Sequence, residues 1–393
     1  MPSSFHPPVR SLMGPGPSDV NPRILEALSR PTIGHLDPEF IRLMDEIKSL
    51  LQYAFRTNNE LTLPVSAPGS AGMEAVFVNL LEHGDKAIVC QNGAFGGRMK
   101  ENVERCGATP IMVMDEWGTA VDLIKVEQAL KSNPDAKMLA FVHAETSTGV
   151  LSDAQRLAAL GHQYGVLVVV DAVTSLGGVP LEVDAWGIDA IYSGSQKCLS
   201  CIPGLSPVSF SARAVDVIRA RKSKVQSWFL DMNLIMDYWG GSTRRSYHHT
   251  APINPLYGLH EALLCLQEEG LPEAWQRHAM QHRAFAAGIE AMGLRLIVDP
   301  LSRLPQLNAV GVPEGIDEAV VRAALLSQYD LEIGAGLGSL AGKIWRIGLM
   351  GYGASQKNVL LCLGALESVL SEQGVQIERG AAVQAANEVY RSA

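Results

Sequence analysis

Two residues, Asp171 and Lys197, have types and positions that suit chemistry at a carbonyl group. Asp171 directly follows the apolar run at 166–170, which is typical of a strand buried on both faces of a parallel sheet. Ligands bind at the carboxyl ends of such strands. Lys197 ends the segment Ser193-Gly194-Ser195-Gln196-Lys197, which follows a second short apolar run at 188–192. A buried lysine loses its proton readily and can then attack a carbonyl carbon.

This pair of residues suits a cofactor that carries an aldehyde on a pyridine ring, namely pyridoxal 5'-phosphate. The amine would form a Schiff base with the aldehyde, and the acid would keep the ring nitrogen protonated so that the ring can accept electrons. Two simpler interpretations stay open on spacing alone. Asp171 could only cap the helix that follows it, and Lys197 could be solvated in its turn of serine and glycine.

The composition is that of an ordinary globular enzyme. The chain has 393 residues, enough for two domains, and 47% of them are hydrophobic and 19% charged. Its 41 acids against 32 bases give a net charge of −9 without any dense basic run, which argues against a nucleic-acid partner. The six cysteines are scattered through mostly apolar segments, which is typical of reduced core residues.

Export and membrane insertion are not indicated. Residues 1–10 carry two adjacent prolines and no apolar segment of a signal peptide, and no stretch holds 18 uninterrupted apolar residues. The last three residues, 391–393, are not the peroxisomal address Ser-Lys-Leu. We therefore expect a cytoplasmic location and no membrane partner.

Helical and strand patterns alternate along most of the chain. Apolar, strand-like runs separated by helical patterns occur at 86–90, 110–114, 137–142 and 166–170. This alternation predicts an α/β fold with a mainly parallel sheet and right-handed crossovers. A long helix at 257–269 then leads to a second α/β region, with strands near 295–298, 308–312 and 331–333 and a last long helix at 355–370.

The same patterns divide the chain into three parts. An extended arm at 1–20 ends in Gly14-Pro15-Gly16-Pro17, which can be neither helix nor inner strand. We expect a large domain at 21–260 and a small C-terminal domain at 261–393. The tail at 377–393 has the pattern of an alanine-rich helix of marginal stability.

Three further features are candidates for ligand contacts. The small residues at 66–76 open a helix and leave its first backbone N–H groups exposed toward an anion, although a plain helix start has the same pattern. Phe95 lies among glycines after a strand, where it could stack on a flat ring or simply join the core. Arg346 lies in a strand whose alternate residues are apolar, and a substrate carboxylate or a buried salt bridge would explain it equally well.

Other patterns argue against metal and dinucleotide sites. The adjacent side chains of His248 and His249 diverge, and no third ligand lies at metal spacing. Cys198 and Cys201 have metal-like spacing but no second pair. The first strand and helix are not joined by Gly-x-Gly-x-x-Gly, which weakens a nicotinamide-dehydrogenase hypothesis.

With these residues, the chain resembles the class V, fold-type I pyridoxal-phosphate aminotransferases, and most of all their alanine–glyoxylate and serine–glyoxylate branch. The resemblance covers the chain from Gly14 to about Leu370. Its motifs are Gly14-Pro15-Gly16-Pro17-Ser18, Glu145-Thr146-Ser147-Thr148-Gly149, Asp171 with Ser175-Leu176-Gly177-Gly178, Ser193-Gly194-Ser195-Gln196-Lys197, Tyr247-His248-His249-Thr250 and Arg346-Ile347-Gly348.

The resemblance implies a large domain whose mainly parallel sheet is sandwiched by helices, and a smaller C-terminal α/β domain. It also implies that Lys197 carries the cofactor and moves the proton, while Asp171 pairs with the ring nitrogen. The remaining roles implied are ring stacking by Phe95, a polar ring contact by Thr146, phosphate contacts by Gly69, Ser70 and Gln196, further phosphate contacts by Tyr247 and Thr250 of a second subunit, and binding of the substrate carboxylate by Arg346. Relatives have histidine where this chain has Ser70, so the phosphate contacts differ in detail.

The reaction implied is transfer of an amino group from alanine or serine to glyoxylate by a homodimer. A second reading is the ureidoglycine–glyoxylate aminotransferase, but that branch carries amide side chains where this chain has His35 and Tyr247. A lyase of the cysteine desulfurase kind would need a cysteine on a mobile loop, and Cys198 and Cys201 follow Lys197 too closely for that.

Overall fold

The computed structural model describes residues 2–240 and 245–392. The first residue of the predicted arm and the last residue of the predicted tail therefore lie outside the described residues. Its largest sheet has seven strands in the order β2-β10-β9-β8-β5-β3-β4. All neighbours are parallel except β10, which runs antiparallel to both β2 and β9. These strands are β2 (Leu61–Val65), β3 (Lys86–Gln91), β4 (Thr109–Met114), β5 (Met138–Val142), β8 (Leu167–Asp171), β9 (Ala190–Tyr192) and β10 (Ser206–Phe210).

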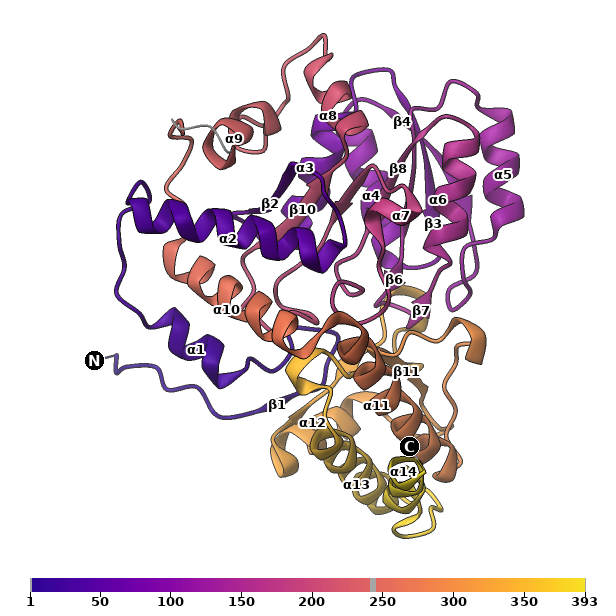
Figure 1. Ribbon diagram of the computed structural model, residues 1–393. Coiled ribbons are helices and arrows are strands. Elements are labelled where there is room, and N and C mark those ends of the chain that lie inside the picture. The colour runs from indigo at the N-terminus through magenta and orange to yellow at the C-terminus, as the bar shows by residue number, and fades with distance from the viewer. Residues whose placement is uncertain (1, 241–244, 393) are drawn as a thin grey trace.

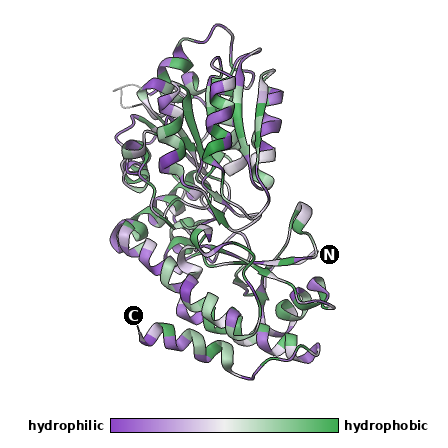
Figure 2. Cartoon of the chain, turned by 90° about the vertical axis from the view of Figure 1, so that its right-hand side faces the viewer, coloured by the Kyte–Doolittle hydropathy of each residue, from purple (hydrophilic) through white to green (hydrophobic). Residues whose placement is uncertain are grey.

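Helices cover both faces of this sheet (Figure 1), and the apolar strands therefore lie between helices whose outer sides are polar (Figure 2). They are α1 (Pro22–Leu28), α2 (Pro38–Phe55), α3 (Gly69–Leu80), α4 (Ala94–Arg105), α5 (Leu123–Ser132), α6 (Ala154–Gln163), α7 (Val183–Trp186), α8 (Ala212–Arg219), α9 (Met232–Trp239) and α10 (Ile253–Glu269). Among the described residues, no helix combines the length and the apolar character that a membrane crossing requires.

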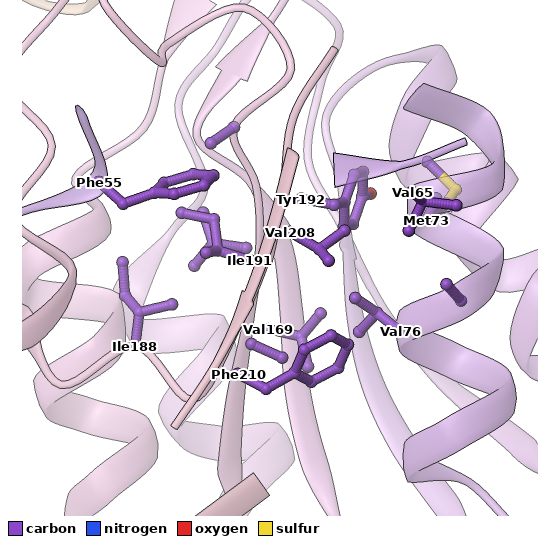
Figure 3. Close-up of a cluster of buried hydrophobic side chains, with 14 of the residues drawn as sticks. Phe55, Val65, Met73, Val76, Val169, Ile188, Ile191, Tyr192, Val208 and Phe210 are labelled. Carbon is purple, nitrogen blue, oxygen red and sulfur yellow. The ribbon is translucent and has the colours of Figure 1, made fainter. Parts of the chain in front are cut away.

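The alternation of side chains along β8 sends its residues to two different helices. A Cβ at Gly161 of α6 would approach Val168 to 2.8 Å, so Val168 faces α6. On the other face, a Cβ at Gly72 of α3 would lie 3.3 Å from the Cβ of Tyr192, which pairs in register with Asp171. Figure 3 shows Tyr192 on this face, near Met73 and Val76 of α3. Asp171 therefore ends β8 on the side that α3 covers.

The C-terminal part has a smaller sheet in the order β11-β14-β13, which is antiparallel throughout. Its elements are α11 (Leu271–Ala291), β11 (Leu307–Gly311), α12 (Glu318–Tyr329), β12 (Leu331–Glu332), β13 (Gly334–Ala335), β14 (Ile344–Gly348), α13 (Gln356–Glu372) and α14 (Ala381–Arg391). The buried apolar residues form one cluster that spans positions 24–274 and another that unites positions 284–386 with Met13. The chain thus has two main cores.

The N-terminal arm belongs to the second of these cores. Its strand β1 (Ser11–Leu12) pairs in parallel with β12, and Met13 is fully buried. The backbone N–H of Gly348 donates to the carbonyl of Met13 at 2.7 Å. The arm therefore runs along the C-terminal part before the chain enters the large sheet (Figure 1).

The predicted α/β class, with a mainly parallel sheet and a further C-terminal α/β part, is confirmed. The sequence reading did not include the helices α7, α9, α11 and α12. The predicted strand at 295–298 is reduced to a single bridge between Leu296 and Val310. The alanine-rich tail forms α14, which packs on α11 and buries Ala382 and Ala386 completely.

Candidate active site

Asp171 ends β8 as a buried carboxylate with two hydrogen bonds. Its Oδ1 accepts from the N–H of Val173, and its Oδ2 accepts from the hydroxyl of Tyr192, each at 2.9 Å. Burial raises the pKa of Asp171 to about 7, although these two bonds and the nearby Lys197 amine act in the opposite direction. Capping of the following turn therefore accounts for only one of its oxygens. The other oxygen, Oδ2, is bound by Tyr192.

Lys197 is not solvated. The loop that follows β9 is buried, and Lys197 itself is only 8% exposed. Its Nζ donates to the carbonyl oxygen of Pro15. Burial lowers the pKa of Lys197 to about 8, and the charges of Arg346 and Arg98 add to this effect. The side chain is therefore an amine that is partly neutral near pH 7, as attack on a carbonyl requires.

The N-terminal arm covers this lysine. Ser18 donates from its N–H to the carbonyl of Gln196 at 3.0 Å and from its Oγ to the carbonyl of Lys197 at 2.7 Å. Gly16 lies so close that a Cβ there would be 2.5 Å from the Nζ of Lys197. The motif that contains Gly14 to Ser18 is thus part of the site.

Arg346 reaches the site from β14 and is held by two backbone carbonyls. Its Nε donates to Ala335 at 2.6 Å, and its Nη1 donates to Thr146 at 3.2 Å. Within residues 2–240 and 245–392, no acid lies within ion-pair distance of this buried guanidinium. A structural salt bridge therefore does not explain Arg346, whereas a ligand carboxylate would.

The N-terminus of α3 lies beside the loop that carries Gln196. Pro68, which precedes the helix, provides no side-chain cap, so the first N–H groups of α3 are available. A Cβ at Gly69 would come within 3.3 Å of the carbonyl of Ser193. Ser70 is exposed, and among the described residues the buried Oε1 of Gln196 has no hydrogen-bond partner. The N–H groups of α3 and the Ser70 hydroxyl form a cradle of donors that suits a phosphate, and the Gln196 Oε1 can accept from a donor elsewhere on the ligand.

Phe95 lies in the first turn of α4, which is capped from another element. Its N–H donates to Glu145 Oε2 at 3.2 Å, and the N–H of Ala94 donates to the Oγ of Ser147 at 2.9 Å. The guanidinium of Arg98 lies 4.7 Å from the centre of the Phe95 ring. One face of the ring is therefore occupied by a cation, and the partly buried side chain also packs against the large core.

The sequence reading missed the roles of Glu145 and Tyr192. Glu145 is fully buried and accepts from the N–H of Phe95 and from both the N–H and the Oγ of Ser147. Tyr192 was treated as an ordinary strand residue, although its hydroxyl contacts Asp171. The position of Tyr192 in the sequence does not indicate this contact. The contact arises because β8 and β9 are neighbours and pair Asp171 with Tyr192.

Tyr247 and Thr250 are not brought to the lysine of their own chain. Both are exposed, and their hydroxyls lie 3.5 Å apart. The ring of Tyr247 packs at 5.2 Å from that of His35. The histidines between them bond to each other at 2.7 Å, and His249 also bonds to Ser66 at 2.7 Å.

Residues 25–354 match the family Aminotransferase class-V. The chain belongs to the class-V aminotransferases. Alanine–glyoxylate aminotransferase of Callithrix jacchus is 41% identical to this aminotransferase over 92% of the chain and 88% of that protein. The family recognised from the sequence motifs is therefore confirmed, and this family uses pyridoxal phosphate.

Two solved structures show the same fold at full length. The alanine–glyoxylate aminotransferase from Nostoc sp. has a TM-score of 0.92 and 44% identity, covering 94% of this chain and 97% of that one. The ureidoglycine–glyoxylate aminotransferase from Bacillus subtilis has a TM-score of 0.96 and 40% identity, covering 99% of this chain and 100% of that one. This class-V aminotransferase therefore has the expected fold-type I architecture.

The residues present fit pyridoxal phosphate. A buried amine, a buried carboxylate, a partly buried aromatic ring and an uncapped helix start suit the aldehyde, ring nitrogen, ring face and phosphate of that molecule. The arginine held by carbonyls adds a place for a substrate carboxylate.

Proposed function

We propose that this aminotransferase uses pyridoxal phosphate to move the amino group of alanine or serine to glyoxylate, which gives glycine and a 2-oxo acid. The observation that carries the proposal is the buried Lys197 amine, whose pKa is depressed by burial and which is electrostatically coupled to Asp171 and Arg346. A transaminase needs a carbonyl-reactive amine, an acid facing the ring nitrogen and a carboxylate anchor. These three residues supply them.

Bound pyridoxal phosphate would supply the carbonyl carbon that takes the amino group and the ring that takes up electrons. The residues that would hold it are Gly69, Ser70 and Gln196 at the phosphate, Asp171 at the ring nitrogen, Phe95 and Thr146 at the ring, and Lys197 at the aldehyde. Arg346 would bind the α-carboxylate of the amino acid and so fix the α-carbon beside the Lys197 Nζ.

Lys197 then acts as the base and acid of the reaction. With its pKa near 8, a useful fraction of the amine is neutral at pH 7 and can take the proton from the substrate α-carbon. The arm covers the resulting ammonium from solvent, so Lys197 can hold this proton and return it to the substrate. The same residues serve the donor and the acceptor in turn, so ping-pong kinetics are expected.

The choice of donor rests on His35 and Tyr247. Their rings pack at 5.2 Å. We propose that this pair, called the aromatic wall, lines the donor site and offers rings rather than amides that could bond a ureido group. A second candidate is ureidoglycine as donor, which the 99% coverage and TM-score of 0.96 with the ureidoglycine–glyoxylate aminotransferase favour. We rank it below alanine and serine because of the aromatic wall.

The proposal includes a homodimer and a cytoplasmic location. Tyr247 is 60% exposed, and its contacts and those of Thr250 within the chain involve neither Lys197 nor Asp171. A second subunit that receives this pair at its phosphate cradle would give both hydroxyls a function. Analytical ultracentrifugation tests the dimer, and mixing a Tyr247→Phe chain with a Lys197→Ala chain tests whether one intact site per dimer restores activity.

Half-reaction spectra test the function itself. The purified protein should absorb near roughly 410–430 nm, and borohydride should abolish this band while attaching the cofactor to Lys197, located by peptide mass spectrometry. Alanine or serine should bleach the band, and glyoxylate should restore it. Bleaching by ureidoglycine alone would establish the second candidate, and no bleaching by any of the three would refute glyoxylate transamination.

A substitution on the aromatic wall separates the two donors. The variant His35→Gln introduces an amide in place of one of the paired rings and keeps Tyr247, to which we assign a phosphate contact. We expect it to lose activity with alanine and to gain activity with ureidoglycine. Equal loss with both donors would show that the wall does not select the donor.

A further inference from the structure

Tyr192 is a strand residue whose side-chain hydroxyl contacts the buried acid Asp171. Its side chain is fully buried between the large sheet and α3, and its hydroxyl donates to Asp171 Oδ2 at 2.9 Å. The two residues pair in register on the parallel strands β8 and β9, so their side chains leave the sheet on the same face. The bond therefore follows from the register and is fixed by the backbone of both strands.

The packing of α3 holds the Tyr192 ring in this place. A Cβ at Gly72 would lie 3.3 Å from the Cβ of Tyr192 and 2.0 Å from the Oγ of Ser206, so only glycine allows the helix to approach this closely. Figure 3 shows the ring beside Met73 of α3 and Val65 of β2, and Tyr192 is fully buried. A tyrosine that is locked in this way presents its hydroxyl at one point only.

We propose that Tyr192 is a positioning residue that holds the Asp171 carboxylate oriented and ionised toward the ring nitrogen of the cofactor. The proposal rests on the pyridoxal-phosphate function argued above. Oδ1 is tied to the N–H of Val173 and Oδ2 to Tyr192, so the carboxylate cannot rotate, while each oxygen keeps one lone pair. One of these lone pairs is left for the ring nitrogen.

The bond also offsets the cost of keeping this acid charged. Burial and the nearby carboxylate of Glu145 raise the pKa of Asp171, and the Val173 N–H, the Tyr192 hydroxyl and the Lys197 amine lower it. Loss of the hydroxyl removes one of the three groups that favour the charged form. A larger fraction of Asp171 would then be protonated at neutral pH. This fraction could not form an ion pair with the protonated ring nitrogen.

The test compares two cofactors that differ only at the ring nitrogen. The full-length apoprotein is titrated with pyridoxal phosphate and with its 1-deaza analogue, which has carbon in place of that nitrogen, using tryptophan fluorescence. Tyr192→Phe should weaken the binding of pyridoxal phosphate about 10-fold or more and change that of the analogue by less than about twofold. The pH at which the preference for pyridoxal phosphate is lost should rise by about one unit.

The matched control is Tyr164→Phe. Tyr164 also donates its hydroxyl to a carboxylate, that of Glu127 at 3.1 Å, but it follows α6 on the other side of the sheet. This variant should bind both cofactors like the original protein. In an Asp171→Asn background, Tyr192→Phe should cause no further loss, because the partner through which it acts has changed.

Three results would overturn the proposal. Equal weakening of both cofactors by Tyr192→Phe would show that the ring only supports packing under α3. Unchanged binding of both would show that the hydroxyl has no influence on Asp171. If the original protein binds neither cofactor, the pyridoxal-phosphate function is refuted, and the role of Tyr192 with it. If the original protein binds both cofactors, the function stands, and the variants then test the role of Tyr192 alone.

Discussion

The Lys197 amine donates a hydrogen bond to the carbonyl oxygen of Pro15, a residue 182 positions earlier in the chain. The segment around Pro15 is fixed on both sides, by the bond from Gly348 N–H to the Met13 carbonyl and by the bond from Ser18 Oγ to the Lys197 carbonyl, each 2.7 Å long. The amine that we expect to react is therefore positioned by the N-terminal arm as well as by its own loop.

Gly16→Ala should damage the site more than the fold. The new Cβ would lie 2.5 Å from the Lys197 Nζ, on a backbone with φ of +101°, so the lysine must move. We expect turnover to fall at least about 10-fold, with a loss of unfolding free energy of about 1–3 kcal/mol from backbone strain. Steady-state rates and urea unfolding measure the two effects.

Gly84→Ala is the control for this variant. Gly84 has a similar φ of +88°, but nothing lies within 4 Å of the added Cβ. It should show the same cost in stability and unchanged turnover. Equal turnover in the two variants would mean that the arm does not position Lys197.

The reactivity of Lys197 should change with pH around 8 rather than around 10. Burial lowers the pKa of this amine to about 8, so the neutral, nucleophilic form should appear as the pH rises through that value. Competitive acetylation of the apoprotein between about pH 6 and about pH 12, followed by peptide mass spectrometry, measures the midpoint at this one residue. A midpoint near the ordinary value of about 10.4 would contradict the burial argument.

Arg346→Lys should affect the substrate more than the cofactor. The guanidinium is held by the carbonyls of Ala335 and Thr146, and lysine lacks the planar fork that could keep both bonds and still pair with a carboxylate. We expect the KM for the amino donor to rise about 100-fold, from the loss of about 2–3 kcal/mol of charge-assisted bonding. Cofactor affinity, measured by fluorescence, should stay within about twofold. A fall in cofactor affinity alone would remove Arg346 from the substrate site.

Glu145→Ala should destabilise the large sheet region strongly. The Glu145 carboxylate accepts from the N–H of Phe95 and from the N–H and Oγ of Ser147, and its removal leaves these three donors without this partner, the two of Ser147 being buried. We expect a loss of about 2–4 kcal/mol in unfolding free energy, measured by urea titration. The exposed Glu60, which pairs with Lys48 on the surface, is the control, and Glu60→Ala should change stability by less than about 1 kcal/mol.

The strands and the main site residues could be predicted because their signals are local. The run at 166–170 is apolar and β-branched, and Asp171 and Lys197 follow strands at the edge where ligands bind. Each of these signals lies within a few residues of the chain. For this reason the α/β class and the candidate lysine, acid and arginine were all accessible from the sequence.

The missing elements have weak or non-local signals. The stripe of α11 that faces the core includes the buried polar residues His278 and Gln281, so its apolar periodicity is poor. His278 is satisfied by the Ala274 carbonyl and by the N–H of Gly351, which is a contact with a distant turn. The bonds of Glu145 and Tyr192 likewise depend on which strands become neighbours, and no spacing in the sequence shows that.

The docking of the arm sets an order for the completion of the site during synthesis. The arm precedes the large sheet in the chain, but the strands that receive it, β12 and β14, follow that sheet and are translated after it. A nascent chain can therefore fold the large sheet and still leave Lys197 uncovered. The lysine is enclosed only when the arm has met the C-terminal strands that receive it.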